Sequence, residues 1–229
     1  MTVATLVLLV LFVGLGRWQW ERGDAKAGLW QAFERGMDSA RPLGASATRK
    51  LERFQHVSVS GVLDAQRQFL LDNRTLDGRA GYEVLTPLRL EDGRVLLVNR
   101  GWIAFSGFRE QLPVVALSRP DAASVTVSGR LDELPSAGLS IGRAAPALTG
   151  SWPRVTTFPG VEELAAALEV QQLEPRVLLL DPDQPEGYIR KWRPPGMEPA
   201  RHWSYAVQFW SFAGVLLILF VALNLRRTT

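Results

Sequence analysis

The chain has 229 residues, 26 of them basic and 23 acidic, and its formal net charge is +3 at pH 7. Because the basic side chains do not gather in one patch, nucleic acid is not an expected partner. The chain has no cysteine, which excludes a disulfide framework, a thiolate zinc site, an iron–sulfur cluster and c-type haem attachment. Its three Met and two His do not suit a copper carrier.

Two apolar runs stand near the ends of the chain, over residues 2–15, continuing toward Trp20, and over residues 206–225. Each reaches about 20 residues, the length that crosses about 30 Å of hydrocarbon. We therefore predict transmembrane helices over residues 1–20 and 206–225. The alternative for the first run is a cleaved secretory signal, but the run has neither a basic n-region nor a small-residue cleavage site. With no Lys or Arg ahead of it, the run leaves open whether further residues precede Met1.

Basic residues beside the two runs indicate the topology. Arg226 and Arg227 place the C-terminus in the cytoplasm by the positive-inside rule. Arg17, Arg22 and Lys26 argue for the opposite orientation, but long domains translocate largely regardless of charge. We expect a multi-pass protein of the cell inner membrane with both termini cytoplasmic. The central body then lies in the periplasm of a bacterium, or in the intermembrane space of a mitochondrion.

A helical extension is expected over residues 21–36. Gln19, Arg22 and Lys26 fall on one helix face, and Gly36 followed by Arg41-Pro42 ends the helix.

The body over residues 37–200 is predicted to be rich in β-structure. We expect Gly61 to end the first strand and turns at Asp77-Gly78, Ala80-Gly81 and residues 91–93. Residues 106–120 are expected to form either a surface loop or a segment that faces a partner. One helix is expected over residues 161–170, with Glu162 and Glu163 in its first turn. The fold class is α+β, with two transmembrane helices flanking a barrel-like extracytoplasmic domain. The expected strands cover residues 54–60, 68–73, 82–90, 95–98, 125–131, 139–141, 154–156, 176–180 and 188–191.

The sequence gives little support for catalysis. It has no Gly-x-Ser-x-Gly motif and no cysteine nucleophile, and two histidines are too few for a metallohydrolase. We therefore do not expect an enzyme. His56 is expected to be a surface imidazole or a core imidazole with its hydrogen bonds satisfied.

His202 stands at the start of the second apolar run, beside Tyr205 and within two helical turns of Gln208. A hairpin of the two spans would bring Gln19, Arg22 and Lys26 to a comparable depth. An imidazole can ligate haem iron, a guanidinium can pair with a propionate, and Trp18 offers a flat apolar wall. The alternative is that all these residues are ordinary interfacial anchors.

Four segments of the chain resemble motifs of the Surfeit locus protein 1 family, in the family's order. The family patterns are G-x-W-Q-x-x-R, N-R-x-x-x-G-x-x-G-Y with T-P-L, V-N-R-G-W-I, and H-x-x-Y-A-x-Q-W-F. The matching segments are Gly16-Arg17-Trp18-Gln19-Trp20-Glu21-Arg22 with Lys26, Asp72-Asn73-Arg74 with Gly78-Arg79-Ala80-Gly81-Tyr82 and Thr86-Pro87, Val98-Asn99-Arg100-Gly101-Trp102-Ile103, and His202-Trp203-Ser204-Tyr205-Ala206-Val207-Gln208-Phe209-Trp210.

The resemblance implies a non-catalytic assembly factor for cytochrome c oxidase that binds haem a and helps it reach the catalytic subunit. Its partners would be that subunit, the haem a synthesis machinery and the lipid bilayer, and a homo-oligomer is open. His202 is the implied haem-iron ligand. One departure is that Phe209-Trp210 reverses the family's Trp-Phe order, which turns the indole by about 100° on the helix. The contact made by Trp210 is therefore open.

The central motifs allow two interpretations. Gly78, Gly81 and Gly101 are expected at turns or close backbone approaches, and Trp102 in the core. The polar pair Asn99 and Arg100 is either part of a buried network that braces residues 72–82, which include Asn73 and Tyr82, or a contact with a partner.

Two functions follow. One is a haem-handling chaperone, and the other is a cofactor-free scaffold that binds oxidase subunits or haem-synthesis partners through the spans and Asn99–Trp102. A membrane enzyme that modifies haem is a weaker third, because no acid, base or redox set is visible.

Overall fold

A computed structural model describes residues 2–36, 40–44, 48–108, 111–118, 123–135 and 151–225. The chain divides into two compact units, a helical one of Met1–Arg35 with Arg193–Thr229 and a β-rich one of Gly36–Trp192. The strand predicted over residues 139–141 and the basic residues 226 and 227 lie outside the described residues.

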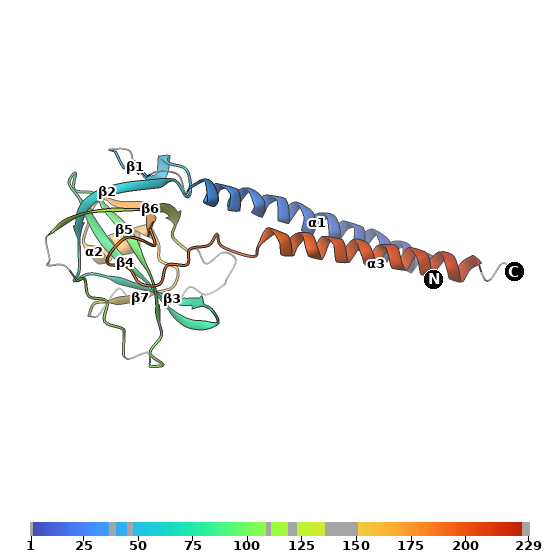
Figure 1. The fold of residues 1–229 in the computed structure, drawn as a ribbon. Coiled ribbons are helices and arrows are strands. Elements are labelled where there is room, and N and C mark those ends of the chain that lie inside the picture. The colour runs from blue at the N-terminus through green and yellow to red at the C-terminus, as the bar shows by residue number, and fades with distance from the viewer. Residues whose placement is uncertain are drawn as a thin grey trace. The chain divides into compact units, whose positions relative to one another are not determined.

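The helical unit contains α1 (Thr2–Arg35) and α3 (Pro199–Leu225). By length and composition both helices are long and apolar enough to cross a membrane. They run side by side in opposite directions, so that the start of α1 and the end of α3 lie at the same end of the pair (Figure 1). The two terminal apolar helices are therefore confirmed.

The β-rich unit is built on a closed ring of five strands. In ring order these are β2 (His56–Leu63), β6 (Ser124–Glu133), β8 (Leu173–Leu180), β5 (Val95–Ala104) and β4 (Arg79–Leu90), and β4 pairs back with β2. Beyond β4 the sheet continues into β3 (Phe69–Leu76) and β7 (Arg154–Thr156), while β1 (Arg41–Pro42) lies beside β2. A 3-10 turn, η1 (Thr48–Lys50), and one short helix, α2 (Val161–Leu168), complete the unit. The predicted barrel-like domain with a single short helix is confirmed.

The first half of β5 and the second half of β8 are buried on both faces, which explains the continuous apolar runs Val95–Val98 and Val177–Leu180. Leu96 and Leu178 belong to the cluster between β2, β6 and β8, whereas Leu97 and Leu179 pack toward α2. The two strands pair in parallel, an arrangement usually covered on both sides. A third cluster around Tyr82 covers the other face of β3 and β4.

Two turn predictions in the first half of the domain were wrong. Gly61 does not end its strand, because β2 continues to Leu63 and pairs from Gly61 onward with β4, while Gly61 and Val62 still pair with β6. A Cβ at Gly61 would lie 2.5 Å from the carbonyl oxygen of Arg89, so glycine permits this close approach. Ala80-Gly81 lies within β4, because the hairpin turn is completed by Asp77 and Gly78, both with positive φ.

The strand predicted over residues 188–191 was also wrong. Only Ile189 pairs there, in a single bridge with Trp102. Gly101, at φ +111°, precedes this bridge, and a Cβ there would lie 2.7 Å from the Ile189 carbonyl oxygen. Arg41 and Pro42, expected only to terminate the first helix, form β1.

Candidate functional site

The register of the helix pair repeats every seven residues. Phe12 lies against Phe209 with 6.5 Å between the ring centroids, Gln19 bonds His202, and Lys26 Nζ donates to the Pro195 carbonyl at 3.1 Å. Each step of seven residues up α1 matches seven residues back toward the start of α3. Seven residues make two helical turns, so these contacts form one seam along the pair.

Two glycines on α1 allow two indoles of α3 to pack on its backbone. Gly16 and Gly23 are the buried residues of α1, and they are seven residues apart. Trp210 lies on Gly16 and Trp203 lies on Gly23, and a Cβ at either glycine would overlap the indole ring. The contact of Trp210, left open by the reversed Phe209-Trp210 order, is therefore with Gly16.

The indole of Trp203 is also held by a hydrogen bond. Its Nε1 donates to Asp24 Oδ1 at 3.1 Å, and its ring lies 6.1 Å from that of Trp20. Gly16 appears above only as the first residue of a motif, and neither Asp24 nor Gly23 was predicted as part of the site. The shared spacing of seven residues between Gly16 and Gly23 and between Trp203 and Trp210 was the signal that could have found them.

The seam brings His202 to Gln19. The distance from His202 Nδ1 to Gln19 Oε1 is 2.8 Å, and both side chains are partly buried. An amide oxygen can only accept a hydrogen bond, so Nδ1 carries the proton and the neutral ring has its lone pair on Nε2. Within the described part of the chain, no hydrogen bond involves Nε2. An imidazole in this state has the donor atom that haem iron requires, so the residues present fit a haem ligand.

The other predicted members of this site are arranged less tightly. Arg22 lies over the Trp18 ring of its own helix, 5.1 Å from the ring centroid. Trp18 is 48% exposed and Tyr205 43%, and Gln208 is exposed. Gln19 thus bonds α3 and Lys26 bonds the segment that leads into α3, whereas no such bond of Arg22 occurs within the described residues.

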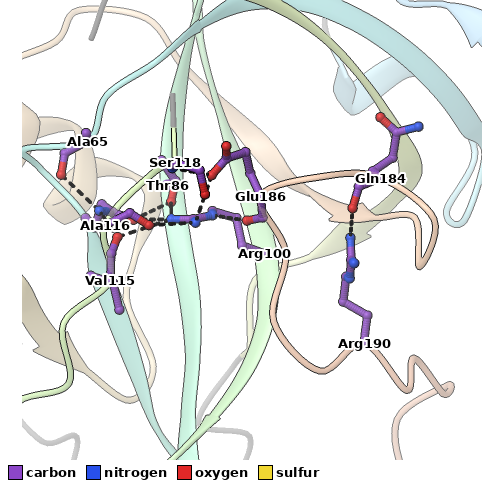
Figure 2. A network of polar contacts seen from close by, with 10 residues as sticks. Ala65, Thr86, Arg100, Val115, Ala116, Ser118, Gln184, Glu186 and Arg190 are labelled. Carbon is purple, nitrogen blue, oxygen red and sulfur yellow. Dashed lines mark hydrogen bonds and ion pairs between the residues drawn. The ribbon is translucent and has the colours of Figure 1, made fainter. Parts of the chain in front are cut away.

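The central motif residues form a second cluster, inside the β-rich unit. Arg100 is 2% exposed, and Figure 2 shows its guanidinium among carbonyl groups from two loops. It donates to the carbonyl oxygens of Val115, Ala116 and Glu186. It also donates to the Gln68 Oε1 at 2.9 Å. Burial lowers the pKa of the Arg100 guanidinium, and the nearby Tyr188 and Glu186 act in the opposite direction.

Asn99 is buried next to Arg100, and both its amide nitrogen and its amide oxygen form hydrogen bonds. Its Nδ2 donates to Glu83 Oε2 at 2.7 Å, and its Oδ1 accepts from the Gly101 backbone at 3.1 Å. With exposures of 2% each, Asn99 and Arg100 match the bracing interpretation rather than a surface contact. The segments that Arg100 braces are not the predicted ones. Its guanidinium bonds the backbone of residues 115–116 and 186 rather than that of residues 72–82.

Trp102 connects this region to residues 72–82. It is 7% exposed, as expected for a core residue, and its Nε1 donates to the Arg74 carbonyl at 3.1 Å. Gly81 faces the Trp102 indole and leaves no space for a Cβ. Tyr82 is buried, while Asn73 has a left-handed φ of 60° and Gly78 lies in the hairpin turn.

His56 is satisfied, as expected. Its Nε2 lies 2.7 Å from Asp181 Oδ2, which also accepts from Ser128. No group of three or more His, Cys, Asp or Glu side chains suited to a metal ion occurs among the described residues.

Comparison with known proteins gives two matches. The family model described as the SURF1 family matches residues 6–214, a span that includes the helix seam and the Arg100 cluster. The chain is also similar to a SURF1-like protein of Dictyostelium discoideum, with 35% identity over 106 residues. That alignment covers 42% of this chain and 39% of the relative, so it spans well under half of the relative's length.

Proposed function

Because the chain belongs to the SURF1 family, we propose that it acts in the assembly of cytochrome c oxidase. In this proposal it serves the oxidase's catalytic subunit and the haem a synthesis machinery as a non-catalytic factor. Its two apolar helices are the membrane spans, in the inner membrane of a bacterium. The β-rich unit is periplasmic, and both termini are cytoplasmic.

The cofactor in this proposal is haem a, held by the helix pair until transfer. The observation that carries it is the state of His202, whose Nδ1 is occupied by Gln19 and whose Nε2 has no hydrogen-bond partner within the described residues. When bound, haem a provides the redox-active iron of the oxidase. Nε2 is the iron ligand, and the half-exposed Trp18 and Tyr205 offer flat apolar surface beside it.

The cations of α1 have separate roles in this site. Arg22 lies over Trp18 and is otherwise exposed, so its guanidinium is placed to pair with a haem propionate. Lys26 donates a hydrogen bond to the Pro195 carbonyl, so its main role is to hold the segment that precedes α3. Arg22 is therefore the stronger candidate for the propionate contact.

The test is the absorption spectrum of the protein isolated in mild detergent from cells that make haem a. We expect a Soret band and a pyridine haemochrome of haem a in the wild type. His202→Ala should lose the band, whereas His56→Asn should keep it because His56 is bonded within the β-rich unit. An unchanged spectrum in His202→Ala would reject His202 as the ligand.

A cofactor-free scaffold remains a second candidate, favoured by one apolar segment. Val115 is buried and its carbonyl accepts from Arg100, while the neighbouring Val114 is 85% exposed. Phe108, earlier in the same loop, is 61% exposed. An apolar side chain projecting from a fixed segment suits contact with an oxidase subunit.

The two candidates separate in a co-purification experiment. If the scaffold role is correct, Val114→Ser and Phe108→Ser reduce recovery of oxidase subunits without changing any haem spectrum. Val3→Ser, at a residue of α1 that is 76% exposed, serves as the control. Full recovery of the subunits with both loop variants would reject this surface.

A further inference from the structure

We propose that Gln19 is a positioning residue that sets the tautomer of His202 and so presents Nε2 to haem iron. This inference rests on the proposed haem site. Gln19 lies on α1, opposite His202 on α3, and does not touch the iron itself.

The direction of the hydrogen bond between Gln19 and His202 fixes the position of the imidazole proton. Gln19 Oε1 lies 2.8 Å from Nδ1 of His202 and can only accept. A neutral imidazole has one N–H, so occupation of Nδ1 by the proton leaves Nε2 as the free donor atom for a metal. Histidine ligands in proteins usually have their second nitrogen held in this way, and the acceptor fixes both tautomer and ring orientation.

The surrounding seam makes this acceptor rigid. Gln19 is flanked by Gly16 and Gly23, one turn to either side, on which the indoles of Trp210 and Trp203 rest. A slip of the helices along the seam would move Gln19 away from His202 and would also break the Lys26 to Pro195 bond. The packing of the glycines and tryptophans therefore determines where the amide oxygen stands.

A purely structural bond between the helices would predict something different. Interhelical polar bonds in membranes stabilise packing whichever way the donor and acceptor are arranged. Both roles place the proton on Nδ1, because Gln19 Oε1 can only accept. Only the positioning role predicts that a weaker acceptor at residue 19 also weakens iron ligation.

The first measurement uses haem-free protein. The chain has two histidines, so nitrogen NMR of ¹⁵N-histidine-labelled protein in detergent gives two ring systems, which His56→Asn assigns. At mildly alkaline pH, where imidazole is neutral, we expect His202 in the Nδ1–H form. Gln19→Met, similar in size but a weak acceptor, should shift it toward the Nε2–H form, and Gln19→Glu should retain the Nδ1–H form.

The second measurement titrates the same proteins with ferric haem b as the probe. Loss of the partner that orients a metal-binding histidine typically weakens metal affinity about 10- to 100-fold, so Gln19→Met should raise the Kd by about tenfold or more. Gln19→Glu should restore tight binding. Gln31→Met, the same change at an exposed site of the same helix, should leave both the tautomer and the Kd unchanged.

The outcomes distinguish this inference from the proposed function. A wild-type His202 in the Nε2–H form overturns the inference, as does haem binding that depends on His202 but not on Gln19. Haem binding that is equally strong in His202→Ala overturns the ligand assignment on which the inference rests. Loss of the Nδ1–H form together with weaker binding in Gln19→Met, and rescue of both by Gln19→Glu, supports it.

Discussion

At the scale of single residues, Arg100 joins parts of the chain that have no regular structure. Residues 112–117 form neither helix nor strand, yet Val115 is 5% exposed. Carbonyl groups buried in such a segment need donors, and the flat guanidinium supplies several at once. Arginine suits this position better than lysine because its donors diverge in one plane.

We predict that Arg100→Met lowers the free energy of unfolding by about 3 kcal/mol or more, because buried acceptors on Gln68, Val115 and Ala116 lose their donor. Arg100→Lys should recover only part of this loss. Denaturant unfolding of the full chain in detergent measures it. Arg79→Met, at an exposed residue of β4, should change stability by less than about 0.5 kcal/mol. Equal stability of the two methionine variants would contradict the bracing role.

Glu174 is a second buried charged residue with a defined set of donors. It accepts from the backbone and hydroxyl of Thr48 at 2.7 Å each, and from Arg94 at 2.8 Å. Burial is the largest effect on the carboxyl and raises its pKa. The hydrogen bonds from Thr48 and Arg94 together outweigh it and leave the pKa of Glu174 below its usual value.

This shift predicts a dependence of stability on pH. A folded-state pKa below the unfolded value means that Glu174 contributes stability above the unfolded pKa, and that this is lost as pH falls through the folded pKa. Glu174→Gln should be less stable than the wild type near neutral pH, and the difference should shrink as the pH falls below about 4. Unfolding curves of both proteins across this range measure it. A difference that stays constant with pH would contradict the prediction.

At the scale of elements, small residues define how α1 and α3 pair. Gly16 and Gly23 on α1 and Ala206 and Ala213 on α3 are the buried residues of their helices, and each pair is seven residues apart. Between apolar helices in lipid, small residues allow close backbone approach, and packing rather than hydrophobic burial drives association. The same spacing sets the register that brings Gln19 to His202.

We predict that Gly16→Val disrupts this register because its side chain would overlap the Trp210 indole. Overpacking of this kind costs about 1–3 kcal/mol. The readout is cross-linking by a short bismaleimide between cysteines introduced at Phe12 and Phe209, possible because the chain has no cysteine of its own.

Gly14→Val is the matched control, because a Cβ there meets no described atom within 4 Å beyond its chain neighbours and the nearby backbone of its own helix. It should leave the cross-linking yield unchanged, while Gly16→Val lowers it. A cysteine at Val10, which is 74% exposed, should cross-link poorly with one at Phe209. Equal yields for the two glycine variants would show that the Trp210 contact does not set the register.

At the scale of the whole molecule, one chain combines two units that depend on different environments. The helical unit exposes most of its large apolar side chains, whereas the β-rich unit buries its own in three clusters. Exposed apolar helices of this length suit lipid, and a closed ring of strands leaves few free edges in water. The chain therefore suits a membrane-anchored domain rather than a protein of a single compartment.

The proposed topology predicts that alkaline phosphatase inserted at Gly93, in the exposed turn between β4 and β5, is active, because the proposal puts this unit in the periplasm. It also predicts that a green fluorescent protein fused after the C-terminus fluoresces, because the proposal puts that end in the cytoplasm. Activity and fluorescence in a bacterial host measure the two positions. An inactive phosphatase together with a dark fluorescent fusion would reverse the proposed topology.

The sequence by itself determined the two apolar helices, the strand-rich body and the short helix α2. These follow from local patterns, namely run length, alternation and turn residues, which need no knowledge of distant contacts. It also identified His202, Gln19 and Arg100 through their motifs. Its errors at Gly61 and at Ala80-Gly81 arose because a glycine looks the same in sequence whether it forms a turn or a close approach.

Only the tertiary structure decided which of these residues meet. The bond from His202 to Gln19 joins positions 183 residues apart, and it depends on the register set by glycines against tryptophans. Likewise, the carbonyls that Arg100 holds come from segments without a pattern of their own. Long-range pairing of this kind depends on how the packed surfaces fit together and on the need of buried polar groups for hydrogen-bond partners. Neither can be read from a short stretch of sequence.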